Sequence, residues 1–272
     1  RKFLVSVWDF NFFLKKVKDS KKIYATVPRK PTIFRRKKSM LKQVLEQFTN
    51  PGSEYRGAPF WAWNAKLEPE ELRRQIRLMK EMGLGGFFMH SRVGLNTPYL
   101  GKEWFECVRA CVDEAEKLDM MAWLYDEDRW PSGAAGGLVT KNPKFRHRHL
   151  SVEILDSLPA KKEGLLALFA AKVNGNEASD IRRLAKNDKP AKGEKVLAFS
   201  VHEAELSSWY NGQTYLDTMN EEAVKKFIEV THEAYRREVS KEFRSRIPGI
   251  FTDEPNYLHG GQNVTAWTAS IP

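Results

Sequence analysis

The chain has 272 residues, of which 42% are hydrophobic, 12% aromatic and 29% charged. This composition excludes a disordered or fibrous protein and is sufficient for one large domain or two ordinary ones. No stretch approaches the roughly 18 to 20 apolar residues that a membrane span needs, so we expect no membrane as a partner.

The net charge of +10 is concentrated at the N-terminus. Residues 1–39 contain 13 Lys or Arg and two Asp, whereas residues 40–272 carry 32 basic and 33 acidic residues. The first 39 residues show no sustained helical or strand period, so we predict a basic extension outside the fold, with Met40 as the natural start. A nucleic-acid-binding arm is the alternative, and we expect it to be the weaker one because the rest of the chain is electrostatically balanced.

Cys107 and Cys111 are the two cysteines of the sequence, and they are four residues apart in a helical pattern. Two cysteines cannot form a disulfide framework, and no Cys or His cluster has the spacing of a zinc site. The sequence therefore predicts two reduced, half-buried thiols and a reducing, cytoplasmic location.

Short apolar runs alternate with amphipathic helices from residue 58 onward, which is typical of repeated β-α units. The pattern predicts strands at residues 58–64, 85–90, 120–125 and 249–252, and helices at 68–83, 101–118 and 221–241. Pro69 at the first helical position supports the start of the first helix, and Asn220 is a suitable N-cap for the last.

About 120 residues separate the third and fourth predicted strands, which is too many for a single crossover. Residues 150–158, 165–174 and 195–203 have the pattern of strands separated by polar turns. We therefore predict a small antiparallel β insertion at about residues 150–205.

Parallel strands in repeated β-α units form either a closed barrel or a doubly wound open sheet. No glycine-rich phosphate loop follows the first strand, and the glycines after the third strand follow acidic residues that would repel phosphate. The predicted fold class is therefore α/β, a partial TIM-type (β/α) barrel with about its first four β-α units in residues 40–272. A complete barrel needs roughly 250 residues without insertions, so we expect the C-terminal half in a longer protein and no activity from this fragment alone.

Catalytic groups of such barrels lie where the strands end and the following loops begin. Tryptophan faces, carboxylates and guanidinium groups at one rim suit a sugar, because they contact C–H groups, hydroxyls and a glycosidic oxygen. We therefore predict a carbohydrate substrate, bound by Trp61, Trp63, Asn64, His90, Arg92, Asp126, Asp128, Arg129, Trp130 and Asp253.

Several of these residues have alternative roles. Asp126, Glu127 and Asp128 suit hydroxyl binding, a divalent cation site or a structural ion-pair network, and strand alternation would point Glu127 away from the other two. The tryptophans suit either a sugar platform or the core, and His90 suits either a core position or a hydroxyl contact. His147 and His149 lie in a basic stretch and are expected at the solvated surface.

Five motifs in order carry a family resemblance. They are PFWAWN (59–64), GFFMHSRVGL (86–95), YLGKEWF (99–105), YDEDRWPSG (125–133) and TDEP (252–255). With these motifs the chain resembles bacterial glycosyl hydrolases around glycoside hydrolase family 106, the α-L-rhamnosidase-like group. The resemblance implies a TIM-type catalytic barrel in a longer multidomain enzyme, and inverting hydrolysis of a terminal deoxy-sugar. It implies no required cofactor and a possible calcium ion near the site.

Glu254 is the predicted catalytic residue, a general acid at the end of the fourth strand that burial and acidic neighbours would make a proton donor. Its structural alternative is a helix cap or an ion pair with Arg92 or Arg129. The second carboxylate of an inverting pair is expected on a later strand. A carbohydrate-binding or catalytically silent relative is the alternative function.

Overall fold

The computed structural model describes residues 32–160, 163–257 and 264–271 of the chain, which divides into two units, residues 1–51 and 52–272. Helix α2 (Thr32–Thr49) belongs to the first unit and continues across the boundary predicted after residue 39. Residues 1–31 of the predicted basic extension lie outside the described residues.

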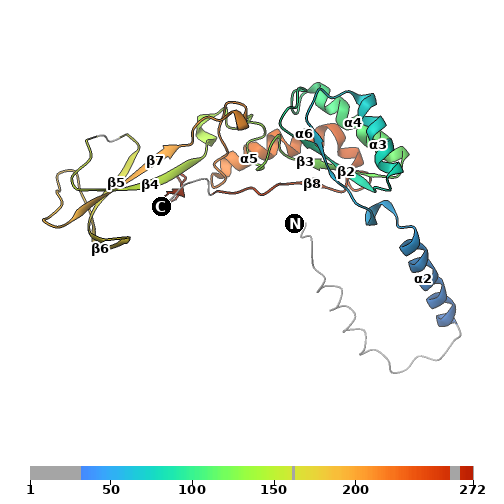
Figure 1. Ribbon diagram of the computed structural model, residues 1–272, viewed down its shortest axis with the longest axis horizontal. Coiled ribbons are helices and arrows are strands. Elements are labelled where there is room, and N and C mark those ends of the chain that lie inside the picture. The colour runs from blue at the N-terminus through green and yellow to red at the C-terminus, as the bar shows by residue number, and fades with distance from the viewer. Residues whose placement is uncertain (1–31, 161–162, 258–263, 272) are drawn as a thin grey trace. The chain divides into compact units, whose positions relative to one another are not determined.

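The second unit is a mixed α/β structure that contains a four-stranded parallel sheet (Figure 1). Its strand order is β1-β2-β3-β8, and each neighbouring pair is parallel. The strands are β1 (Phe60–Trp63), β2 (Gly86–Ser91), β3 (Met121–Tyr125) and β8 (Ile250–Phe251). Helices α3 (Pro69–Glu81) and α4 (Lys102–Lys117) connect the first three strands, so the predicted β-α order is confirmed.

The helix predicted at residues 221–241 is two helices, α5 (Glu221–Val230) and α6 (His232–Val239). Asn220 caps α5 as expected, because its side chain accepts hydrogen bonds from the backbone N–H groups of Glu222 and Ala223. The break falls at Thr231, whose hydroxyl donates to the Phe227 carbonyl at 2.7 Å. A threonine that bonds back to the preceding turn bends a helix, and helical periodicity alone does not show this.

The main core lies between one face of the parallel sheet and helices α3, α4 and α6. Sheet residues that point to the helices are buried with the inner faces of those helices; they include Trp63, Phe87, Met89, Ala122 and Leu124. Cys107 and Cys111 belong to this core and are fully buried, not half-buried as predicted. Burial raises the pKa of Cys107 to about 11, which keeps its thiol protonated near neutral pH.

The other face of the parallel sheet is aromatic and strongly curved. Phe60 on β1 and Phe251 on β8 lie on the two outer strands, yet their ring centroids are 5.0 Å apart. In a flat sheet three strand spacings would separate them by about 14 Å. The sheet therefore curls around this face, and Phe60 remains 53% exposed on it.

The predicted insertion supplies four strands of a five-stranded antiparallel sheet in the order β6-β5-β7-β4-β9, and the fifth strand, β9, comes after β8 in the chain. Three strands match the prediction, namely β4 (Arg148–Leu155), β5 (Leu165–Asn174) and β7 (Lys195–Glu203). Sequence analysis missed β6 (Glu177–Arg183), which is exposed throughout and has no apolar alternation, and β9 (Val264–Ala266), which has only three residues.

Short 3-10 helices complete the secondary structure at Ser53–Tyr55, Pro143–Phe145, Ser208–Tyr210 and Ser240–Glu242. In the part of the chain that the structure describes, none of the helices combines the length and the hydropathy of a membrane span.

Candidate functional site

The loop that follows β3, residues 126–137, begins with three buried acidic side chains. Asp126 accepts hydrogen bonds from the hydroxyls of Ser132 and Thr252, both at 2.6 Å, and lies 3.5 Å from Nε2 of His232. Burial raises the pKa of Asp126 and lowers that of His232, so the surroundings disfavour the charged form of each group. Asp126 therefore joins the ends of β3 and β8 to helix α6.

Glu127 is surrounded by the backbone of its own loop. Its carboxylate accepts four backbone hydrogen bonds of 2.6 to 2.8 Å, which come from Asp128, Gly133, Ala135 and Gly136. Burial raises the pKa of Glu127 to about 7, although the four N–H groups favour the charged form. Glu127 therefore stabilises the conformation of its own loop.

Asp128 connects the loop to two other segments. It accepts hydrogen bonds from the Ser91 hydroxyl at 2.5 Å and the Asn211 amide at 3.0 Å. Gly136 has a φ of +60°, and a Cβ there would lie 2.9 Å from the Cβ of Asp128, so the loop needs glycine at this point. All three acids thus have partners within the protein. These partners are mainly hydroxyl, amide and backbone N–H donors, and of the two arginines predicted for an ion-pair network, Arg129 lies 3.5 Å from Asp128.

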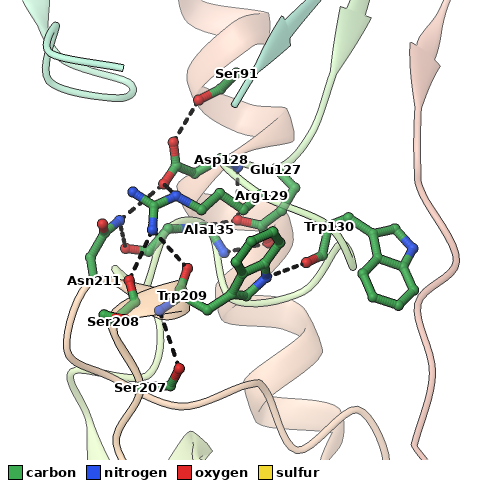
Figure 2. A network of polar contacts seen from close by, with 11 residues as sticks. Ser91, Glu127, Asp128, Arg129, Trp130, Ala135, Ser207, Ser208, Trp209 and Asn211 are labelled. Atoms are coloured by element: carbon green, nitrogen blue, oxygen red, sulfur yellow. Dashed lines mark hydrogen bonds and ion pairs between the residues drawn. The ribbon is translucent and has the colours of Figure 1, made fainter. Parts of the chain in front are cut away.

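Arg129 holds the segment that leaves the antiparallel sheet. Its guanidinium donates to the carbonyls of Ser208 and Trp209 at 2.9 and 3.2 Å and lies 3.5 Å from Asp128 (Figure 2). The indole N–H of Trp209 donates to the Trp130 carbonyl at 2.6 Å, while the Trp130 ring extends away from this network (Figure 2). Arg129, which sequence analysis predicted to bind a sugar, therefore binds the backbone carbonyls of residues 208–209.

Asp253 follows β8 and is tied to β3. Its carboxylate accepts a hydrogen bond of 2.6 Å from the Tyr125 hydroxyl, and its backbone N–H donates to the Ser132 hydroxyl at 2.8 Å. Burial and the neighbouring Asp253 raise the pKa of Tyr125, so its hydroxyl stays protonated and remains a donor. Hydrogen bonds consequently connect the C-terminal ends of β3 and β8. We call this edge of the parallel sheet, with the loops that follow its strands, the rim.

Glu254 lies on this rim and is exposed, not buried as its predicted role as an acid would require. One carboxylate oxygen accepts a hydrogen bond of 3.0 Å from the Trp130 indole, whose side chain is 39% exposed. The φ of Glu254 is +43°, a region that residues with a Cβ seldom adopt and that is common at functional sites. Glu254 and Trp130 thus present a carboxylate and an aromatic ring to solvent.

His90 lies on the curved aromatic face beside this rim. Its ring packs on Tyr125 with centroids 3.7 Å apart, and its Nδ1 is buried without a hydrogen-bond partner among the described residues. Burial lowers the pKa of His90, so the ring is neutral at pH 7. A buried polar atom beside an open face is available to a bound hydroxyl.

The remaining predicted residues, Trp61, Trp63, Asn64 and Arg92, are divided between the two faces of the sheet and the loops. Trp63 is 2% exposed in the core, and the Trp61 indole donates to Gln75 of α3 at 2.9 Å, so both rings face the helices. These two tryptophans pack in the interior, the alternative that sequence analysis left open. Asn64 and Arg92 are exposed in the loops after β1 and β2.

Sequence analysis missed the residues that connect the rim. They are Ser91, Tyr125, Ser132, Trp209, Asn211, His232 and Thr252. Most come from segments far apart in the chain, whereas Ser91 and Tyr125 end β2 and β3 and Thr252 directly follows β8, so a strand end marks these three.

The described residues contain no group of three or more His, Cys, Asp or Glu side chains arranged to hold a metal ion. The oxygens of Asp126, Glu127 and Asp128, which a calcium ion would need, already accept hydrogen bonds from the protein. The three carboxylates, as they are placed, do not fit a calcium ion.

Comparison with known proteins gives little further information. No protein-family model and no curated protein matches the chain. A rhamnosidase from Novosphingobium sp. PP1Y is a similar solved structure, with 20% sequence identity and a TM-score of 0.35. The match covers 52% of this chain and 17% of the rhamnosidase, and a TM-score this low carries no argument about fold or function.

Proposed function

We propose that this chain supplies part of the active site of a glycoside hydrolase of the α-L-rhamnosidase-like type, which cleaves a terminal sugar by an inverting mechanism. The observation that carries the proposal is the exposed Glu254 carboxylate, held at 3.0 Å by the indole of an exposed tryptophan on the same rim. Sugar-cleaving sites combine a carboxyl that reaches a glycosidic oxygen with an aromatic face that contacts C–H groups. The five ordered motifs support the same class of enzyme.

We propose that the four parallel strands are part of a (β/α) barrel. The 5.0 Å contact between Phe60 and Phe251 supports this, because it requires the curvature of a closing sheet. The aromatic face would then line the barrel interior, and the ends of β3 and β8 would lie at its catalytic mouth.

In this mechanism Glu254 donates its proton to the glycosidic oxygen while the bond from that oxygen to the anomeric carbon breaks. A water molecule attacks the same carbon from the opposite face, and a second carboxylate accepts the proton of the water. An inverting pair requires roughly 6.5 to 9.5 Å between the two carboxyl groups. We assign the second carboxylate to no residue of this chain.

The buried acids have a supporting role in the proposal. Asp126, Glu127 and Asp128 fix the loop that carries Trp130, and Arg129 fixes the segment that carries Trp209. The sugar contacts would come from wholly or partly exposed side chains at the rim, and from His90, whose buried Nδ1 has no hydrogen-bond partner among the described residues. We propose Glu254, Asp253, His90, Asn64, Arg92 and the ring of Trp130 for these contacts.

One observation favours the alternative of a carbohydrate-binding or silent relative. Glu254 is exposed, whereas a general acid of this type lies in buried surroundings that favour its protonated form. The alternative retains the binding surface and omits the proton transfer, so measurements of binding and of turnover separate the two functions.

Titration of the chain with 4-nitrophenyl α-L-rhamnoside, followed by isothermal calorimetry and by 4-nitrophenol release, tests the proposal. We expect saturable binding that Trp130→Ala weakens about tenfold, or about 1.4 kcal/mol, because the stacking surface is removed. Trp61→Phe is the matched control, since Trp61 faces the helices. Any turnover should disappear in Glu254→Gln while binding persists. No binding by the unaltered chain would contradict the proposal.

A further inference from the structure

Two histidines face each other on the antiparallel sheet. His149 on β4 and His202 on β7 are direct partners in the strand register, and their ring centroids are 5.3 Å apart with an interplanar angle of 26°. His202 is exposed and His149 is partly exposed, so His149 is not fully solvated as predicted. His147, two residues earlier, is buried, contrary to the prediction that both are at the surface.

A third polar side chain, that of Ser151, lies on the same face of the sheet as the two histidines. Ser151 follows His149 by two residues, and its hydroxyl lies 2.8 Å from Nε2 of His202. On β9 the partner of His149 is Ala266, and the partner of Ser151 is Val264. The three polar side chains are therefore neighbours on the adjacent strands β4 and β7.

The spacing suits two imidazoles that share one metal ion. A zinc–nitrogen bond is about 2.0 to 2.1 Å long, so a tetrahedral ion bound by one nitrogen from each ring would place the ring centres about 5 Å apart. The observed separation of the ring centroids is 5.3 Å. Binding of a shared ion also requires one nitrogen of each ring to point to it.

We propose that His149 and His202, with the Ser151 hydroxyl beside them, form a surface site for a divalent transition-metal ion of the zinc class. Imidazole nitrogen is a preferred ligand of zinc, copper and nickel, whereas calcium and magnesium prefer oxygen. Water molecules would complete the coordination. This site is separate from the rim of the parallel sheet and does not depend on the proposed function.

Glu203, which follows His202 in the sequence, is engaged with Arg146 at 2.8 Å. The proposed protein ligands are therefore the two imidazoles and the Ser151 hydroxyl.

Isothermal calorimetry of the tag-free chain with Zn²⁺ at pH 7.5 tests the site, with Ca²⁺ as the matched ion. We expect one Zn²⁺ per chain, a loss of affinity of at least about tenfold in both His149→Ala and His202→Ala, and no competition by Ca²⁺. A smaller loss is expected for Ser151→Ala. Glu153→Gln, on the same strand and face as His149, is the control and should bind like the unaltered chain.

Imidazole NMR spectra of the unaltered chain keep the test independent of variant folding. Zn²⁺ should shift the resonances of both His149 and His202 at the same stoichiometry. No heat of binding at 1 mM Zn²⁺, or equal binding by both alanine variants and the unaltered chain, would overturn the proposal. Shifts confined to other histidines would overturn it as well.

Discussion

The chain places acidic residues after two strands of one sheet, and the two groups differ in their environment. After β3, Glu127 is buried and accepts four backbone hydrogen bonds. After β8, Glu254 is exposed, and among the described residues its carboxylate accepts one hydrogen bond, from the Trp130 indole. Two carboxylates that follow neighbouring strands can therefore differ in role. One binds the backbone of its own loop and stabilises it, whereas the other is exposed to solvent. The number of hydrogen-bond donors that the protein supplies to each carboxylate distinguishes the two cases.

The largest expected effect is the loss of stability in Glu127→Gln. The amide nitrogen cannot accept the bonds that one carboxylate oxygen now accepts, so two buried N–H groups lose their partner. We expect the free energy of unfolding to fall by about 3 kcal/mol and the Tm by about 10 °C. Denaturant and thermal unfolding at pH 8 measure both quantities. An unchanged Tm would show that Glu127 does not stabilise the loop and would contradict the distinction between Glu127 and Glu254.

Asp128→Asn should have an intermediate effect. Asparagine has one acceptor oxygen, so it can retain the hydrogen bond from Ser91 or that from Asn211 but accepts only weakly from both. We expect a loss of about 1 to 2 kcal/mol in denaturant unfolding. The double variant with Ser91→Ala should cost little more than Asp128→Asn alone, and full additivity would show that Ser91 and Asp128 are not coupled.

Low pH should lower the stability of the folded chain through His90 on β2. Burial lowers the pKa of His90 in the folded chain, so below about pH 6.5 the unfolded chain binds a proton that the folded chain does not. Stability therefore falls as pH decreases from 6.5, by about 1.4 kcal/mol for each unit of pKa shift. Unfolding curves between pH 7 and pH 5 should show a smaller decrease for His90→Gln. Parallel curves for the two proteins would argue against this assignment.

The order of strands and helices was largely predictable because the helices of the main core are amphipathic. Pro69 and Gly83 mark the limits of α3, and an apolar stripe defines α4. The break at Thr231 was not predictable, since one hydroxyl bond to a carbonyl changes the helix without altering its pattern. Strand β6 has no apolar face, so its sequence carries no strand signal.

The sequence predicted that the site residues follow the ends of the parallel strands. It did not predict which of these residues are buried and hydrogen-bonded within the protein and which are exposed. Trp61 and Trp63 alternate with Phe60 and Ala62, and only the structure shows which pair faces the helices. The partners of Asp126 and Asp128 include Thr252 and Asn211, which are 126 and 83 residues away in the chain. Local spacing cannot predict such distant donors, and so the buried acids resembled ligand-binding residues.

The smallest expected effect is that of Trp130→Phe on stability. This change removes the indole N–H that bonds Glu254 and retains an aromatic ring on an exposed site. We expect a change of a few tenths of a kcal/mol in the free energy of unfolding, within the range of surface substitutions. The Tm should therefore hardly change. A decrease in the free energy of unfolding of more than about 1 kcal/mol would show that the hydrogen bond between Trp130 and Glu254 also stabilises the fold.

The most direct test of the comparison is carbonyl NMR of the chain labelled with ¹³Cδ-glutamate, in which Glu127→Gln and Glu254→Gln assign the two carboxyl signals. Addition of methyl α-L-rhamnoside should shift the Glu254 signal and leave the Glu127 signal in place. A shift of the Glu127 signal with an unchanged Glu254 signal would contradict the division into a loop-holding and a ligand-facing carboxylate.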